Sequence, residues 1–199
     1  QPFHVGHYHV AQEALKISKN LIFVIGSHDK ARDIRNPFTT DERIAIIKAS
    51  MDDYTVDPKN DPFANIHFAP QVDHTYNEER WIASVQASVS TIIFSKYRPD
   101  PTRICIVGYD KDHSSYYLKK FPQWDLVEIP MKHILDATSI RESLINSAIP
   151  TAPSASFANV DAWYKTLEVT NKIHEQLKKE YDHVQSYKRQ WENSPYPVT

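Results

Sequence analysis

Short apolar runs alternate with amphipathic stretches along the first 150 residues. Two runs, at 21–25 and 103–107, are rich in β-branched residues, and each is followed by a glycine, Gly26 or Gly108. Such runs are typical of strands buried on both faces of a parallel sheet. Shorter strands are expected at 66–69 and 126–129, and helices at about 6–18, 40–51, 77–90, 114–120 and 138–146. This alternation predicts an α/β fold in which helices cover both faces of a parallel sheet.

The pattern changes near Asn159. A long charged helix, rich in Lys, Glu, Tyr and Gln, is expected from about residue 163 to 191, and the Pro-containing end at 193–197 is typical of a linker. We therefore divide the chain into a domain at 1–150 and a helical extension with a linker at 151–199.

Composition narrows the possible functions. The 199 residues carry a formal net charge of −2, which does not favour a general binder of nucleic acid or of membrane surfaces. No apolar stretch approaches the roughly 20 residues that span a bilayer. The single cysteine, Cys105, lies in an apolar run and has no partner for an internal disulfide, so we expect a reduced, cytoplasmic setting.

The residues that best indicate chemistry are His4-Val5-Gly6-His7, at the start of the first predicted helix. A glycine lets the backbone approach a ligand closely, and a helix start offers free N–H groups to an anion. Two imidazoles there would suit a polyphosphate whose charge rises during a reaction. A loop with two solvated histidines is an alternative, as is a zinc site made by His4, His7 and His9, although no suitably spaced fourth ligand follows.

Three later clusters also offer groups that bind anions. Arg32, Arg35 and Arg43 follow the first strand, where guanidinium groups either hold phosphate in a bidentate manner or are simply solvated. Thr39 and Glu42 have the spacing of a capping box at the start of the second helix.

The second cluster is the stretch from Gly108 to Tyr117, with a cation and hydroxyls after a strand end. In the third, Thr138 and Arg141 are three residues apart at a predicted helix start, so both could face the same anion.

The order of these motifs resembles a known enzyme superfamily. His4-Val5-Gly6-His7 with Thr138-Ser139-Ile140-Arg141 resembles the paired signatures of the adenylyl- and cytidylyltransferases. The block at 35–43, Arg-Asn-Pro-Phe-Thr…Glu-Arg, is similar to that of nicotinamide mononucleotide (NMN) adenylyltransferases. The stretch at 108–124, Gly…Lys-Asp…Ser-Tyr-Tyr-Leu…Phe-Pro-Gln-Trp, resembles the type fused to a C-terminal Nudix hydrolase domain.

The resemblance implies a Rossmann-like nucleotidyltransferase fold and the reaction NMN + ATP → NAD + pyrophosphate. It implies catalytic roles for His4, His7, Arg35 and Arg141. It further implies ATP contacts from His4, Gly6, His7, Gly108, Asp110, Lys111, Thr138, Ser139 and Arg141, and NMN contacts from Arg35, Asp73, Asn77 and Trp81. Asn77 and Trp81, four apart, lie on one face of the predicted helix, although Trp81 would equally suit a helical core. Mg²⁺ is expected to arrive with ATP, without a metal site made by the protein.

The same resemblance leads us to expect a strand ahead of Gln1, a Nudix domain after the linker and a possible homo-oligomer. Other enzymes with this signature, such as pantetheine-phosphate adenylyltransferases, remain alternatives within the class. A non-catalytic module that senses NAD or another nucleotide is the alternative outside it.

Overall fold

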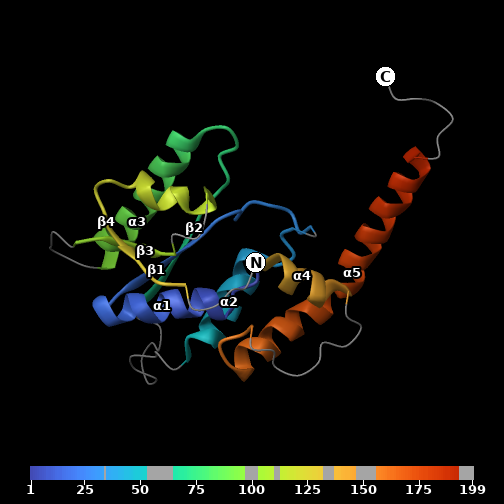
Figure 1. The fold of residues 1–199 in the computed structure, drawn as a ribbon, viewed down its shortest axis with the longest axis horizontal. Helices are drawn as coiled ribbons and strands as arrows, with labels where there is room; N and C mark the ends of the chain where they lie inside the picture. The colour runs from blue at the N-terminus through green and yellow to red at the C-terminus, as the bar shows by residue number, and fades with distance from the viewer. Residues whose placement is uncertain are drawn as a thin grey trace.

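The computed structural model describes residues 1–33, 35–52, 65–96, 103–109, 113–131, 137–146 and 156–192. In chain order the elements are α1 (Val5–Ile17), β1 (Leu21–Ile25), α2 (Thr40–Ser50), β2 (Ile66–Pro70), α3 (Glu78–Lys96), β3 (Cys105–Gly108), the 3-10 helix η2 (His113–Lys120), β4 (Asp125–Glu128), α4 (Ala137–Asn146) and α5 (Val160–Glu192) (Figure 1). Each expected element is confirmed, although the short helix near 114–120 is of the 3-10 type.

The strands pair in parallel, as the sequence predicts. β1 pairs with β2, from Leu21 opposite Ile66 to Ile25 opposite Pro70. β3 pairs with β4, from Cys105 opposite Asp125 to Gly108 opposite Glu128. Within the described ranges these are two separate two-stranded ladders. Gly108 ends β3, whereas Gly26 directly follows β1.

Helices cover both faces of β1, because its side chains alternate between two hydrophobic clusters. Leu21, Phe23 and Ile25 pack into one cluster, with apolar side chains of α1, α2 and β2. Ile22 points to the other face, where it packs with α3 residues such as Val85 and Val89. This alternation, with period two, produces the three layers expected of an α/β fold.

The strands are less buried than their apolar sequences predict. Val24 is 43% exposed, and Cys105, expected inside a strand buried on both faces, is also exposed. Both side chains line an open cavity, which accounts for their exposure.

A third hydrophobic cluster joins α2, α4 and the first part of α5. Ile46 of α2, Leu144 of α4 and Trp163 of α5 are all buried there. Asn159 caps α5: its Oδ1 accepts the Ala162 N–H at 2.7 Å, and its Nδ2 donates to the Ala49 carbonyl at 3.0 Å. This cap starts α5 three residues earlier than the charge pattern predicts, and the far end of the helix extends away from the body of the protein (Figure 1).

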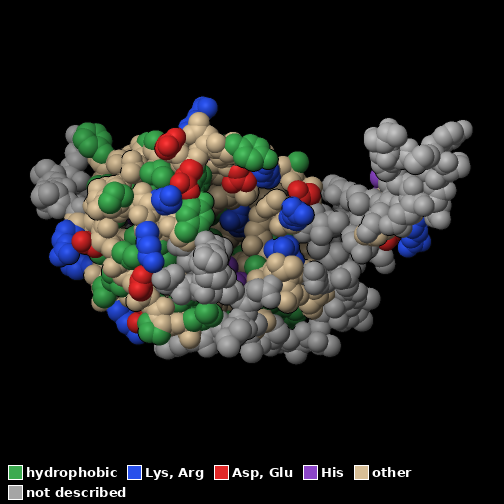
Figure 2. Space-filling model, turned by 45° about the horizontal axis from the view of Figure 1, so that its top comes forward, with side chains coloured by type: hydrophobic (Ala, Val, Ile, Leu, Met, Phe, Trp, Pro, Cys, Tyr) green, Lys and Arg blue, Asp and Glu red, His purple; other side chains and the backbone are tan. Residues whose placement is uncertain are grey.

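The surface agrees with the near-neutral charge. On the face shown in Figure 2, Lys and Arg side chains are interspersed with Asp and Glu. No helix in the described part of the chain is both long enough and apolar enough to cross a membrane.

The cluster that joins the three helices predicts a large effect of Ile46→Ala, because Ile46 is 0% exposed. We expect the free energy of unfolding in urea to fall by about 2–5 kcal/mol. Ile17→Ala, at a helical position that is 58% exposed, is the matched control and should change it by about 0.5 kcal/mol or less. Equal effects of the two substitutions would contradict the assignment of the core.

Candidate active site

Residues 1–7 are held in place by partners from distant parts of the chain. The Gln1 side chain donates to Asn36 Oδ1 at 3.1 Å and accepts the Phe38 N–H at 3.0 Å. Arg141 of α4 donates to the Gln1 carbonyl at 3.0 Å. The Arg-Asn-Pro-Phe block and the Thr-x-Ile-Arg element therefore meet at Gln1.

Two further contacts fix the start of α1. The Val5 N–H donates to the Ser156 carbonyl at 2.7 Å, and the Tyr109 hydroxyl, which follows β3, donates to the Gly6 carbonyl at 3.2 Å. Segments on both sides of the fold thus set the position at which the first helix begins.

The two histidines of the motif form a reciprocal cap at this helix start. The Gly6 N–H donates to His4 Nδ1 at 3.1 Å, and the His4 N–H donates to His7 Nδ1 at 3.4 Å. The ring centroids are 4.0 Å apart. Because each Nδ1 accepts a hydrogen bond, the neutral rings carry their proton on Nε2. His4 is only 7% exposed, so it is not a solvated loop residue.

Gly6 is required by this cap. A Cβ at position 6 would lie 2.9 Å from Cε1 of His4 and 3.1 Å from its Nδ1, too close for any side chain. The glycine of the motif thus permits the contact between backbone and ring that orients His4.

His7 is exposed because its ring opens to the cavity, yet many protein atoms lie around it. Desolvation by these atoms lowers the pKa of His7 from 6.5 to about 3, with further lowering by charge at His4 and Arg43. His7 is therefore neutral near pH 7. It can act there as a hydrogen-bond donor through Nε2–H, without carrying a charge.

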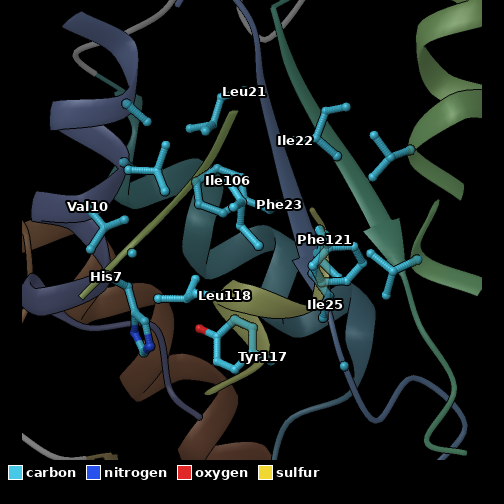
Figure 3. Close-up of a pocket in the computed structure, with 18 of the residues that line it drawn as sticks. His7, Val10, Leu21, Ile22, Phe23, Ile25, Ile106, Tyr117, Leu118 and Phe121 are labelled. Atoms are coloured by element: carbon cyan, nitrogen blue, oxygen red, sulfur yellow. The ribbon is translucent and has the colours of Figure 1, made fainter. Parts of the chain in front are cut away.

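The cavity has a volume of about 1630 Å³, more than a typical small-molecule site needs. Figure 3 shows apolar side chains such as Leu21, Ile22 and Ile106 around one part, and His7 with Tyr117 at the other end. The polar and aromatic side chains that line it include His4, His7, Arg43, Asp73, Asn77 and Trp81. The structure thus brings together most of the residues assigned to the two substrates.

The three arginines after β1 have different surroundings. Arg32 makes a bidentate pair with Glu42, at 2.9 Å for both contacts, and also donates to the Pro37 carbonyl. Glu42 in turn caps α2 together with Thr39, which confirms the predicted capping box. Arg35 is exposed and does not line the cavity, whereas Arg43 does.

The residues assigned to NMN take part in local structure as well. Asp73 accepts the Ser27 N–H at 3.1 Å and the Ser27 hydroxyl at 2.8 Å, and so holds Ser27 at a φ of 56°. Asn77 caps α3, because its Oδ1 accepts the Arg80 N–H at 2.9 Å. Trp81 packs edge-on against Tyr117 and Phe121, at the border between the cavity and the α3 cluster.

The residues expected at the ATP phosphates lie at the start of α4. Arg141 donates to the Thr138 hydroxyl at 3.2 Å, so the two side chains lie together at this helix start. Thr138 and Ser139 are exposed. Gly108 ends β3 and lines the cavity. A Cβ atom at position 108 would lie 2.9 Å from the Leu118 side chain, which packs against this glycine. Asp110 and Lys111 lie outside the described residues.

The zinc alternative gains no support from the geometry. His9 is buried and lies 3.7 Å from the carboxylate of Glu13 on the same helix. Among the residues that the structure describes, no group of three metal-binding side chains comes together.

Sequence reasoning missed two residues of this site and did not single out a third. Gln1 and Tyr109 act through hydrogen bonds to residues 35 or more positions away, and no local pattern announces such contacts. Arg43 was visible as a cation after a strand, but its neighbours Arg32 and Arg35 gave the same signal.

A parallel α/β fold with this capped histidine pair beside an arginine-lined cavity defines a nucleotidyltransferase. The model of the cytidylyltransferase-like family matches residues 1–114, more than half of the chain, and the chain belongs to that family.

Within the family, the chain is similar to the nicotinamide/nicotinic acid mononucleotide adenylyltransferase of Acinetobacter baylyi. The two are 36% identical over 156 residues, which cover 75% of this chain and 76% of that protein. It is also 36% identical over 86 residues to the nicotinamide-nucleotide adenylyltransferase of Sulfurisphaera tokodaii, covering 43% and 46% of the two chains.

The fold is similar to the crystal structure of a bifunctional NMN adenylyltransferase/ADP ribose pyrophosphatase from Francisella tularensis. The TM-score is 0.75 at 28% sequence identity, and the match covers 100% of this chain. The chain spans 55% of that longer protein.

The surroundings of His7 predict an unusual titration. Because its pKa is about 3, we expect the His7 ring resonances in NMR spectra to keep their neutral positions from pH 8 down to about pH 4.5. The His7→Gln variant assigns these resonances. The unfolded state takes up this proton near pH 6.5, so the folded state loses stability through this group as the pH falls below 6.5. A midpoint near 6.5 in the folded protein would contradict the desolvation of the ring by the protein atoms around it.

Proposed function

We propose that this protein is an NMN adenylyltransferase that converts NMN and ATP into NAD and pyrophosphate. The observation that carries the proposal is the reciprocal histidine cap, which turns Nδ1 of both rings to the backbone in a cavity that Arg43 also lines. Membership of the cytidylyltransferase-like family supports the reaction class, and the relatives named as mononucleotide adenylyltransferases support the substrates.

The reaction needs no nucleophile from the protein. An oxygen of the NMN phosphate attacks the α-phosphorus of ATP in line, and a new oxygen–phosphorus bond forms. The bond from the α-phosphorus to the oxygen that bridges to the β-phosphate breaks, and pyrophosphate leaves with that oxygen. Because both reactants are anions, catalysis consists mainly of positioning and of stabilising negative charge.

His4 and His7 are proposed to donate from Nε2 to the oxygens of the α-phosphate, where charge develops in the transition state. Their Nδ1 atoms are held by backbone N–H groups, so the rings need little reorganisation to do so. Arg141 with Thr138 is proposed to bind the β- and γ-phosphates, with Ser139 beside them. The hydrogen bond from Arg141 to the Gln1 carbonyl places this arginine next to the histidine motif.

The two ends of the dinucleotide are assigned from the family resemblance, and the cavity supports the assignment for the described residues. We assign adenosine to Gly108 and the following residues, which include Asp110 and Lys111. Asp73, Asn77 and Trp81 lie at the carboxyl end of β2 and the start of α3, where we place the nicotinamide riboside. Arg35 is proposed to act near the reacting phosphates, although in this structure it faces solvent.

The metal ion of the reaction is proposed to be Mg²⁺ that enters with ATP. The described residues gather no cluster of metal-binding side chains here, which fits an ion held by the phosphates of the nucleotide. Such an ion would neutralise charge on the phosphates that the two histidines and Arg141 orient.

Three further proposals concern the cellular location, a fused domain and the oligomeric state of the protein. A reaction that uses ATP, and an exposed thiol such as Cys105, suit the cytoplasm. A fused Nudix domain remains a prediction, supported by the bifunctional relative of which this chain spans 55%. A homo-oligomer also remains a prediction.

Pyrophosphate release from the purified protein tests the proposed function. We expect release with ATP plus NMN well above that with ATP plus phosphopantetheine, and a parallel assay with nicotinic acid mononucleotide measures the preference between the two pyridine nucleotides. Binding of NAD without any release would support the sensing module instead. Release with phosphopantetheine alone would place the protein in another branch of its family.

Replacing His7 tests the assigned chemistry. His7→Ala removes a donor to the charge of the transition state, so we expect kcat to fall by about 10²–10³-fold with a much smaller change in the KM for ATP. His183→Ala, at an exposed position of α5, is the matched control and should keep wild-type turnover. A loss of less than threefold in His7→Ala would remove His7 from the mechanism.

A further inference from the structure

Arg43 lies where the first strand, the second helix and the cavity meet. It belongs to the second turn of α2, is half-buried, and donates from Nη1 to the Gly26 carbonyl at 2.6 Å. This bond fixes the guanidinium at the carboxyl end of β1, the edge of a parallel sheet where ligands bind. The side chain lines the same cavity as His7.

Most of the hydrogen-bonding capacity of Arg43 is unused by the described residues. A guanidinium has five N–H donors, and the Gly26 carbonyl takes one of them. No carboxylate of the described part of the chain forms an ion pair with it, whereas Arg32 has Glu42 on both arms of its fork. A half-buried cation without a carboxylate is costly unless an anion arrives to pair with it.

The pKa shifts of Arg43 and His7 agree with the position of Arg43 in the cavity. Burial lowers the pKa of Arg43, while the charge of Asp73 acts in the opposite direction. Asp73 itself is bound to Ser27, so it offers only a distant attraction. Arg43 also contributes to the low pKa of His7, which shows that its charge reaches the histidine pair.

Arg43 is therefore close to both ends of the proposed site. Its partner Gly26 precedes Ser27, which binds Asp73 at the nicotinamide riboside. The guanidinium also lines the same cavity as His7, at the group to be transferred. The anion that belongs at this junction is the phosphate of the mononucleotide, the nucleophile of the reaction. We propose that Arg43 binds this phosphate and holds it in line with the α-phosphorus of ATP. This inference rests on the proposed function.

The geometry also explains why an arginine is suited to this position. One arm of the fork can keep the Gly26 carbonyl while the other N–H groups contact two phosphate oxygens. A lysine has a single ammonium group on a flexible stem, so it cannot hold the strand end and the phosphate with the same fixed geometry.

The test compares two ligands that differ only in the phosphate, NMN and nicotinamide riboside. Their dissociation constants are measured by calorimetry for the wild-type protein and for Arg43→Gln and Arg43→Lys. We expect Arg43→Gln to weaken NMN binding by about 10- to 100-fold, the range for a lost charged hydrogen bond, and to leave riboside binding unchanged. Arg43→Lys should fall between wild type and Arg43→Gln, and KM for ATP should change less than threefold in both.

Arg32→Gln is the matched control, because Arg32 is paired within the protein. It should lower the melting temperature without changing the ratio of NMN to riboside affinity. If Arg43→Gln fails to fold, Arg43→Lys carries the test through the same ratio.

Equal losses of affinity for NMN and for nicotinamide riboside would overturn the proposal. Arg43 would then be a structural residue at the end of β1. A rise confined to the KM for ATP would overturn it by assigning the guanidinium to the other substrate. These outcomes differ from failure of the proposed function, in which the wild-type protein neither binds nor converts NMN, and which would overturn both.

Discussion

The site depends on one constraint, the docking of the first seven residues onto parts of the chain that are distant in sequence. Gln1 is held by the loop before α2 and by Arg141, Val5 by Ser156, and Gly6 by Tyr109. Each contact alone contributes modestly to stability, about 1 kcal/mol for a typical hydrogen bond. Together they fix where α1 begins and hence where both histidines point. Motifs far apart in the sequence are thus connected physically before any substrate is bound.

In the proposed mechanism the helix cap and the chemistry use the same two rings, the cap through Nδ1 and the chemistry through Nε2. In an ordinary capping box a Ser or Thr side chain satisfies the free N–H groups of the first turn, as Thr39 does with Glu42 at α2. In α1 the two imidazoles take these positions, which leaves Nε2–H of each ring as its second polar group. The pKa of His7 is lowered to about 3, and the pair is proposed to orient phosphate oxygens by hydrogen bonding while the arginines supply the positive charge.

Local patterns predicted the elements and the contacts within them. The β-branched runs gave the strands, the Thr39–Glu42 spacing gave the start of α2, and Thr138 meets Arg141 as their spacing implies. What the local patterns missed was the individual side-chain contacts that depend on long-range packing. Three arginines in one loop look alike in sequence, yet one pairs with Glu42, one faces solvent and one lines the cavity. The exposure of Cys105 likewise follows from the cavity beside β3, which the composition of the strand cannot show.

A crystal structure of the protein with bound NAD tests the account most directly, because the product spans both halves of the proposed site. From the roles proposed for His4, His7 and Arg43, we expect the pyrophosphate of NAD to lie between the Nε2 atoms of the two histidines and the guanidinium of Arg43. The adenosine should then lie beside Gly108 and the nicotinamide beside Trp81. A dinucleotide bound with its pyrophosphate beyond hydrogen-bonding distance of the histidine pair, or with its two ends exchanged, would contradict it.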